Sequence, residues 1–288
     1  MTGIDGVAVV DKPAGCTSHD VVAQVRRQFG TRKVGHAGTL DPDATGVLVL
    51  GVGRATRLLR YVGDLPKSYA GEVVLGVGTT TLDAGGEVVA TADMGGVTLA
   101  HVRAAAAGMV GRLEQVPPMV SAVQVGGRRL HELAREGVEV ERAARVVTVT
   151  RFDVLGTGSG EGAFRVEVDC SSGTYVRSLA ADLGAALGGP AHLRRLRRTA
   201  VGAFTEQRAR PVEQLELLPP RAAVEHLAEV AVDDEVAHLV RTGRRLDRAG
   251  PTPFEGPGPW AVVAGDGSLL AVYRADDGRA RPEVVLAG

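Results

Sequence analysis

The sequence is poor in cysteine and has no long apolar run. Its two cysteines, Cys16 and Cys170, lie far apart and in no metal-binding spacing, so we expect reduced thiols, with neither a disulfide nor a metal. No uncharged apolar stretch approaches the roughly 18 residues of a membrane span. The first residues also lack the basic region of a signal peptide. Together these absences predict a cytoplasmic protein without membrane contact.

The sequence is also poor in aromatic residues and in net charge. Aromatic side chains make up 3% of the chain, and the net charge is −1, which taken alone argues against a nucleic-acid partner. The charges are segregated, however: residues 192–210 and 26–33 are strongly basic, whereas residues 213–235 are acidic. Because local charge decides whether a groove attracts phosphate, the two basic stretches keep a nucleic acid among the candidate partners.

The rest of the composition is typical of a globular protein with a full core. The chain has 288 residues, of which 44% are hydrophobic. Helical spacing predicts helices at residues 17–30, 54–62, 98–110 and 174–188, the first capped by Thr17 or Ser18 and ended by Gly30. Apolar runs and period-two alternation predict strands at residues 6–10, 45–53, 68–78, 145–155 and 163–170, the last two paired. These patterns predict a mixed α/β fold.

The pattern divides the chain into two domains. Residues 1–210 carry the α/β pattern, and residues 211–229 are expected to form a linker with two short helices. Residues 230–288 show short apolar runs separated by Gly-Asp turns, which are typical of a small β-barrel. Within the first domain, residues 117–145 combine Pro, Gly-Gly and many charges. We expect them to project as an insertion that is helical at 128–136.

The stretch GHAGTLDPDATGVL, residues 35–48, places two carboxylates in one bend before an apolar strand. Asp41 precedes a proline, which favours an extended backbone, and Gly35 and Gly38 let the chain bend. Asp41 and Asp43 share one turn, a poor arrangement for a glycosidase pair that must straddle its bond at about 5–10 Å. The spacing leaves two interpretations open. Asp41 bonds its own backbone in an ordinary turn, or it acts chemically, alone or with a cation.

Several motifs occur in a fixed order along the chain. They are DKPAGCTSHDVV (11–22), KVGHAGTLDPDATGVL (33–48), KSY (67–69), TTTLDAGGEV (79–88), QVPPMVSA (115–122), CSSGTYVRSLAADLG (170–184) and HLRRLRR (192–198). In this combination the sequence resembles the TruB family of bacterial tRNA pseudouridine-55 synthases over about residues 4–200. The resemblance implies an α/β (α+β) fold: a mixed, largely antiparallel sheet with flanking helices, followed by a small C-terminal PUA-like β-barrel that binds RNA.

The resemblance implies isomerisation of uridine 55 in the T-loop of tRNA. The C1′–N1 bond breaks, the uracil turns, and a C1′–C5 bond forms, without a cofactor or metal. The base must leave its stack to be reached. Three catalytic residues are implied: Asp41 as nucleophile or as base, Arg177 as its cation partner, and Tyr69 as the surface on which the base stacks. Tyr69 is also a candidate for helping to remove the C5 proton.

The resemblance further implies a set of RNA contacts. His36, expected in a loop, would occupy the stack that the flipped base leaves. The insertion would grip the T-arm, and the basic stretches would hold phosphates. Substrate or RNA contacts are therefore expected at Lys12, Asp83, Tyr175, Leu196, Arg128, Arg129, Arg197 and Arg198.

Two other functions stay open at this point. One is a catalytically silent factor that binds or folds tRNA, and the other is a nucleosidase or glycosidase, which would need a second acid. The combination of Asp41, Tyr69 and Arg177 favours the synthase. The expected partner is the T-arm of tRNA, with no obligate protein partner, and the protein is expected to be a monomer.

Overall fold

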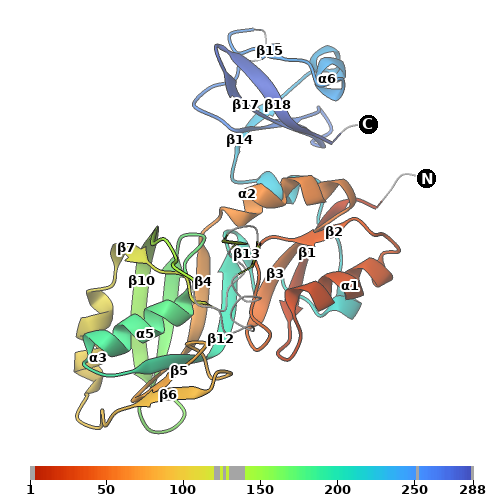
Figure 1. Ribbon diagram of the computed structural model, residues 1–288. Helices are drawn as coiled ribbons and strands as arrows, with labels where there is room; N and C mark the ends of the chain where they lie inside the picture. Colours follow the sequence, from red (N-terminus) through yellow and green to blue (C-terminus); the bar gives the residue numbers. More distant parts are fainter. Residues whose placement is uncertain (1–3, 120–123, 126–127, 130–139, 251–252, 287–288) are drawn as a thin grey trace.

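The computed structural model describes residues 4–119, 124–125, 128–129, 140–250 and 253–286 (Figure 1). Its centre is a nine-stranded sheet with the order β1-β3-β12-β4-β11-β10-β7, to which β2 adds beside β3 and β13 beside β12. Among the described strands of this sheet, β3 and β12 alone pair in parallel, so the prediction of a mixed, largely antiparallel sheet is confirmed. The strands are β1 (Gly6–Lys12), β2 (Val34–His36), β3 (Thr45–Val52), β4 (Lys67–Leu75), β7 (Gly111–Gln115), β10 (Arg145–Thr157), β11 (Ala163–Cys170), β12 (Ala191–Val201) and β13 (Phe204–Thr205).

Strands β1 and β3 are buried on both faces. Along β3, Val47 and Val49 belong to the core that also contains residues of α2 (Leu59–Gly63) and of the C-terminal sheet. Leu48 and Leu50 belong to the core beneath α1 (Ser18–Gln28). Strands covered on both faces read as continuous apolar runs rather than as alternating ones. This explains why GVAVV and TGVLVLGV contain no polar face.

The expected helices are present, with shifted ends. Helix α1 begins after a capping box between Thr17 and Asp20, and Gly30 follows its end with a φ of 61°. The segment expected to be helical at 54–62 divides into a 3-10 helix, η1 (Gly53–Leu58), and α2. Helices α3 (Leu99–Ala107) and α5 (Val176–Ala186) pack together with β4, β10, β11 and β12 in one core.

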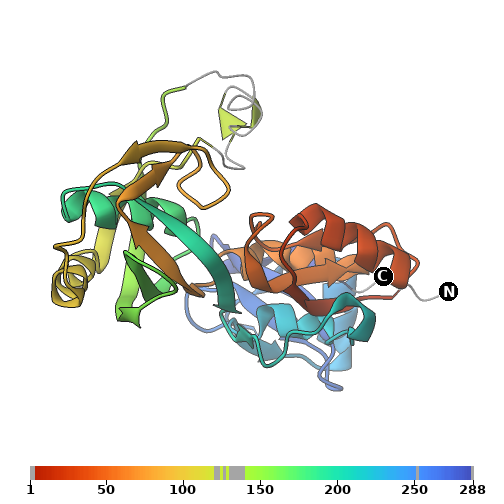
Figure 2. The same cartoon turned by 90° about the horizontal axis from the view of Figure 1, so that it is seen from below.

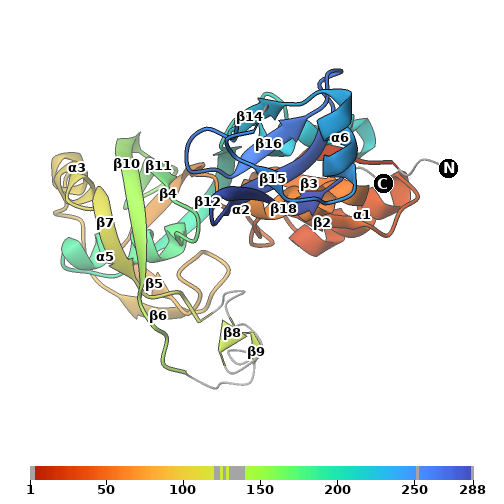
Figure 3. The same cartoon turned by 90° about the horizontal axis from the view of Figure 1, so that it is seen from above.

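Two expectations differ from the structure between β4 and β10. The strand expected at 68–78 ends at Leu75, because Gly76 turns the chain with a φ of 86°; β5 (Val77–Thr79) then pairs with β6 (Val88–Thr91). The helix expected at 128–136 is wrong at its start, because Arg128–Arg129 form strand β9, which pairs with β8 (Gln124–Val125) apart from the large sheet (Figures 2 and 3). Residues 130–139 lie outside the described residues. A Gly-Gly pair between two short segments is a sequence signal for two paired strands. Here this signal decides the structure of Arg128 and Arg129, and the helical spacing of 128–136 does not.

The segment after β13, expected to be a linker, packs against the large sheet. Its two short helices, as expected, are η2 (Val212–Gln214) and η3 (Pro220–Val224). Arg210 and Leu218 form β-bridges with Val10 and Val7 of β1.

The C-terminal part is a curled five-stranded sheet, which confirms the expected small β fold (Figure 1). Its core contains Trp260 and Tyr273, and Val284 joins the core shared with η1 and α2. The amphipathic helix α6 (Asp234–Arg241) was not expected, although Asp233 caps it. The strands are β14 (Ala228–Ala231), β15 (Leu246–Asp247), β16 (Trp260–Val263), β17 (Leu269–Asp276) and β18 (Arg279–Val285). None of the helices among the described residues is long and apolar enough to cross a bilayer.

Candidate active site

The loop that carries Asp41 connects β2 to β3 and is held by buried side chains. Ser18 Oγ accepts a hydrogen bond from the amide of Leu40 (2.9 Å) and donates one to its carbonyl (3.1 Å). Lys12, fully buried, donates from Nζ to the carbonyls of Pro42 (2.9 Å) and Ala44 (2.7 Å). The backbone on both sides of Asp41 is therefore fixed, as a positioned functional side chain requires.

Arg198 fixes the same loop from β12. Its side chain is 1% exposed and donates to the carbonyls of Gly38 (3.1 Å) and Val47 (2.7 Å). At the point where β3 and β12 pair, a Cβ on Gly46 would lie 2.2 Å from the carbonyl oxygen of Arg198, and Gly46 has a φ of 98°. Only glycine fits there. The pairing of β3 with β12, which joins β1, β2 and β3 to the rest of the large sheet, thus lies directly beside the Asp41 loop.

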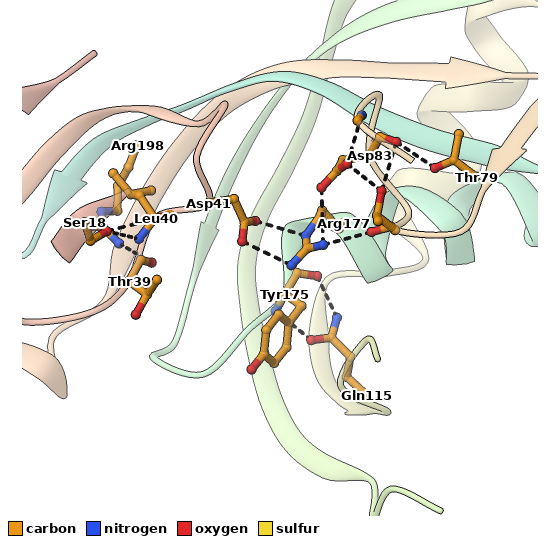
Figure 4. A network of polar contacts seen from close by, with 12 residues as sticks. Ser18, Thr39, Leu40, Asp41, Thr79, Asp83, Gln115, Tyr175, Arg177 and Arg198 are labelled. Atoms are coloured by element: carbon orange, nitrogen blue, oxygen red, sulfur yellow. Dashed lines mark hydrogen bonds and ion pairs between the residues drawn. The ribbon is translucent and has the colours of Figure 1, made fainter. Parts of the chain in front are cut away.

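Asp41 forms a two-point ion pair with Arg177 of α5. Arg177 Nε lies 3.0 Å from Asp41 Oδ2, and Nη2 donates to Oδ1 at 3.2 Å (Figure 4). The guanidinium is 5% exposed, whereas the Asp41 side chain is 38% exposed. A planar guanidinium matches a carboxylate in this geometry and fixes its orientation. One face of Asp41 is thus held by the protein and another is open.

Asp83 lies on the other side of the same guanidinium. Arg177 Nη1 donates to Asp83 Oδ2 (3.2 Å) and to the carbonyl of Thr81 (2.9 Å). The remaining oxygen of Asp83 accepts from Thr81 Oγ1 (2.6 Å) and from the amide of Gly85 (3.0 Å). The turn between β5 and β6 therefore orients the arginine that orients Asp41.

Arg177 occupies an unfavourable place in its helix. It stands in the first turn of α5, where the helix dipole favours acidic side chains and disfavours a cation by about 0.3–1 kcal/mol. The carboxylates of Asp41 and Asp83 offset this cost. A buried cation at a helix N-terminus between two carboxylates indicates a functional constraint rather than a device for helix stability.

Asp41, Arg177 and Tyr69 share a cavity of about 280 Å³. Tyr69, on β4, is half-buried, and Leu196 lies beside it. A β-bulge in β12, between Arg194 and Arg197, contains both Leu196 and Arg195, which adopts a φ of 54°. Bulges of this kind redirect side chains next to active sites. The lining residues are Gly38, Thr39, Leu40, Asp41, Gly63, Lys67, Tyr69, Gly173, Thr174, Tyr175, Val176, Arg177, Leu196 and Arg198.

Burial sets the protonation of these groups. It raises the pKa of the Asp41 carboxyl above its ordinary value, and the charge of Arg177 opposes that rise. Burial likewise raises the pKa of Tyr69, so the ring stays a neutral phenol. It lowers the pKa of Lys67 to about 8, and the nearby charge of Arg198 adds to this effect. Among the described residues, no cluster of His, Cys, Asp or Glu is arranged to hold a metal ion.

The structure brings most of the expected site residues together. Asp41, Tyr69, Tyr175, Arg177, Leu196 and Arg198 line the cavity, and Asp83 contacts Arg177. Lys12 lies beneath the Asp41 loop and is not among the residues that line the cavity. His36 belongs to strand β2, not to a loop as expected, and its ring contacts that of His19 edge to face. Burial lowers the pKa of His36 to about 4, so its ring is neutral.

The basic run of β12, which is expected to hold phosphates, also makes contacts within the protein. Arg197 pairs with Asp11 through both terminal guanidinium nitrogens, Nη1 and Nη2 (2.9 and 3.2 Å), and Arg198 is buried against backbone carbonyls. Arg194 contacts Glu72 at 2.7 Å. Arg198 thus holds the Asp41 loop, whereas Arg194 and Arg197 form part-exposed ion pairs with Glu72 and Asp11. The phosphate contacts expected of Arg197 and Arg198 stay predictions. The side chains of Arg128 and Arg129 lie outside what the structure describes.

Sequence reasoning missed the residues that support the site. The sequence indicates Ser18 only as a possible helix cap, and it includes Lys67 only within the KSY motif. Gln115, which contacts the backbone of Tyr175, was not considered. All three stand within the quoted motifs, but the partners of Ser18 and Gln115 are far away in the sequence, so the motifs do not show what these side chains contact.

Comparison with known proteins decides the family. The model of the TruB family pseudouridylate synthase N-terminal domain matches residues 26–176, and the model of the tRNA pseudouridine synthase II C-terminal domain matches residues 227–287. The chain belongs to the TruB family of pseudouridylate synthases. A family relative from Thermobifida fusca is 48% identical over 99% of both chains, and one from Arthrobacter sp. is 45% identical over 99% of this chain and 97% of its own. Both are named tRNA pseudouridine synthase B.

Solved structures of more distant relatives share the fold. The chain resembles a protein in a crystal structure of a Cbf5-Nop10-Gar1 complex, with a TM-score of 0.74, 26% identity and coverage of 97% of this chain and 83% of that one. A structure of an H/ACA RNP bound to a substrate RNA containing 2′-deoxyuridine matches with a TM-score of 0.73 at 24% identity, over 98% of this chain and 85% of that one. The expected family and fold class are thereby confirmed.

Proposed function

We propose that this protein converts uridine 55 in the T-loop of tRNA to pseudouridine. Membership of the TruB family and the names of its relatives support a tRNA substrate. The observation that carries the catalytic part is the Asp41–Arg177 pair in the wall of a cavity that also contains Tyr69. The pair fixes the carboxylate on one side and leaves it partly exposed on the other, where a nucleotide can enter.

The chemistry requires a carboxylate next to C1′ of a flipped nucleotide. The C1′–N1 bond breaks, the uracil turns in place, and C5 bonds to C1′; N1 then carries a proton and C5 loses one, so no atom is gained or lost overall. Asp41 acts as a nucleophile toward C1′ or as a base toward the 2′ hydrogen, and both roles need its ionised form. Arg177 favours that form because it is the cation closest to the carboxylate.

Tyr69 is proposed as the surface on which the flipped base stacks. Stacking on an aromatic ring contributes about 1–3 kcal/mol per base, and the ring lies in the cavity wall beside Leu196. Its raised pKa keeps the hydroxyl protonated. A phenol cannot accept a proton, which favours the stacking role over removal of the C5 proton.

The remaining assignments follow the same proposal. Tyr175 and Leu196 shape the cavity, Asp83 orients Arg177, His36 fills the vacated stack, and the 117–145 insertion with Arg128 and Arg129 grips the T-arm. Residues 1–210 form the catalytic domain, and residues 230–288 form a PUA-like domain that binds RNA. We further propose that the protein acts in the cytoplasm, as a monomer and without an obligate protein partner.

Two other functions predict different outcomes. A silent tRNA-binding factor would need no oriented carboxylate, so the ion pairs of Arg177 with Asp41 and Asp83 speak against it. A glycosidase would use a second, independent acid and would release free uracil. Asp83 is a poor second acid, since it is bound to the same guanidinium as Asp41.

The decisive experiment compares Asp41→Asn with Asp43→Asn. Asp43 is an exposed carboxylate two residues along the same loop and serves as the matched control. With tRNA tritiated at C5 of its uridines, Asp41→Asn should bind tRNA and release no tritium, whereas Asp43→Asn should release it as the unchanged protein does. Mapping of the product should place pseudouridine at position 55. Full tritium release by Asp41→Asn, or free uracil as product, would refute the proposal.

A further inference from the structure

Gln115 joins strand β7 to the start of helix α5. It is the last residue of β7 and is 3% exposed. Its Oε1 accepts a hydrogen bond from the amide of Tyr175 (2.7 Å), and its Nε2 donates to the carbonyl of the same residue (3.1 Å) (Figure 4). The side-chain amide thus satisfies both backbone groups of one residue, as a neighbouring strand would do in a sheet.

Helix α5 lacks the usual cap of its own. Helices α1, α3 and α6 each begin with a side chain, from Thr17, Thr98 or Asp233, that accepts a hydrogen bond from their first turn. Tyr175 stands at the corresponding position of α5 and makes no such bond. Gln115 holds the backbone of that position from another element. The direction in which α5 starts is therefore set by β7.

The start of α5 carries two groups of the candidate active site. Tyr175 lines the cavity, and Arg177, two residues further on, holds Asp41 and Asp83. A shift of the Tyr175 backbone would move the Arg177 guanidinium relative to Asp41. A two-point ion pair tolerates little displacement, because both nitrogen–oxygen contacts must be kept at once.

We propose that Gln115 is a positioning residue that fixes the first turn of α5, so that Arg177 orients Asp41 for the reaction. This inference rests on the proposed function. Gln115 is not itself among the residues that line the cavity and acts through Tyr175 and Arg177. Both ends of the buried amide are satisfied, so the contact is specific in its geometry, which a buried apolar side chain would not be.

The test uses Gln115→Met, which keeps a similar volume and removes both hydrogen bonds. Glu114→Gln, at the exposed neighbour on the same strand, is the control. In single-turnover tritium release with saturating tRNA, Gln115→Met should react at least tenfold more slowly, while its Kd for tRNA stays within twofold of the parent. The control should match the parent in both. An unchanged rate for Gln115→Met would overturn the inference.

The pH profile separates positioning from simple loss of folded protein. Asp41 faces Arg177 of α5, Asp83 of the β5–β6 turn, Lys12 of β1 and Asp43 of its own loop. Arg177 is the strongest of these influences, so loosening it should move the acid limb of the kcat profile of Gln115→Met to higher pH. Gln115→Glu keeps the acceptor for the Tyr175 amide and should show a smaller shift, which covers the case in which Gln115→Met does not fold. A slower rate with an unshifted acid limb would refute the inference, whereas tritium release by Asp41→Asn would refute the proposed function itself.

Discussion

Replacing Arg177 by methionine should destabilise the protein and leave two carboxylates without their shared cation. Removing one partner of a buried ion pair costs about 3–5 kcal/mol. The guanidinium is 5% exposed, but the Asp41 and Asp83 side chains are 38% and 29% exposed, so water screens part of the uncompensated charge. We therefore expect the free energy of unfolding to fall by about 2–4 kcal/mol. The pKa of Asp41 should rise further, because burial and the charge of Asp83 are then opposed by the weaker influence of Lys12 and no longer by Arg177.

The second carboxylate supplies an internal check on this reasoning. If the cost arises from unpaired charge, adding Asp83→Asn to Arg177→Met should restore about 1–2 kcal/mol relative to the sum of the single changes. Urea unfolding followed by far-UV circular dichroism is the suitable assay. Fluorescence alone is unsuitable, since the single tryptophan, Trp260, lies in the C-terminal sheet. Equal unfolding midpoints and m-values for the Arg177→Met variant and the parent would show that the ion pairs contribute nothing measurable.

Two further predictions concern His36 and the basic surface. The pKa of His36 is lowered from 6.5 to about 4 in the folded protein, so folding disfavours protonation of the ring. The contribution of neutral His36 to the free energy of unfolding is therefore fully present above pH 6.5. It is lost as the pH falls toward 4, by up to about 3 kcal/mol. His36→Phe should therefore lose less stability than the parent between pH 7 and pH 5 in urea unfolding, and an equal loss would contradict the pKa. In tRNA binding, each exposed arginine that contacts a phosphate should contribute about −0.7 to −0.9 to the slope of log K against log salt concentration. Arg32 is exposed, so Arg32→Ala should make this slope less steep. Arg197→Ala should leave the slope unchanged, because Arg197 is paired with Asp11. The reverse ranking in a salt titration would show that the part-exposed Arg197–Asp11 pair opens in the complex.

The elements that the sequence predicts well have strong local signals. The capping box at Thr17, the continuous apolar runs of β1 and β3, and the alternation in β10 and β11 each determine their structure through neighbours in the chain. The errors occur where a long-range contact or a short turn decides. The β8–β9 hairpin replaced the start of an expected helix, and Gly76 divided an expected strand.

The residues of the candidate site likewise differ in how well the sequence predicts them. The motifs predict Asp41, Tyr69 and Arg177, because each stands in a stretch with its own distinctive sequence. The state of the arginines in 192–210 could not be predicted, since Asp11 and Glu72 reach them from β1 and β4. The pattern of charges in a sequence shows how many cations are present, but not which of them already have a partner.

The departures from local rules converge on the cavity. Arg177 places a cation at a helix N-terminus, Arg195 adopts a left-handed conformation within a strand, and Lys12 is an ammonium with no exposed surface. Each is unfavourable by itself. Arg177 is compensated by its ion pair with Asp41 and Lys12 by the carbonyls of the Asp41 loop, and Arg195 stands next to Leu196 in the cavity wall. Stability alone would select an acidic first turn, a regular strand and an apolar side chain at these positions. Their common location therefore indicates that this part of the fold is built to hold one carboxylate in place, which is what the proposed reaction at C1′ requires.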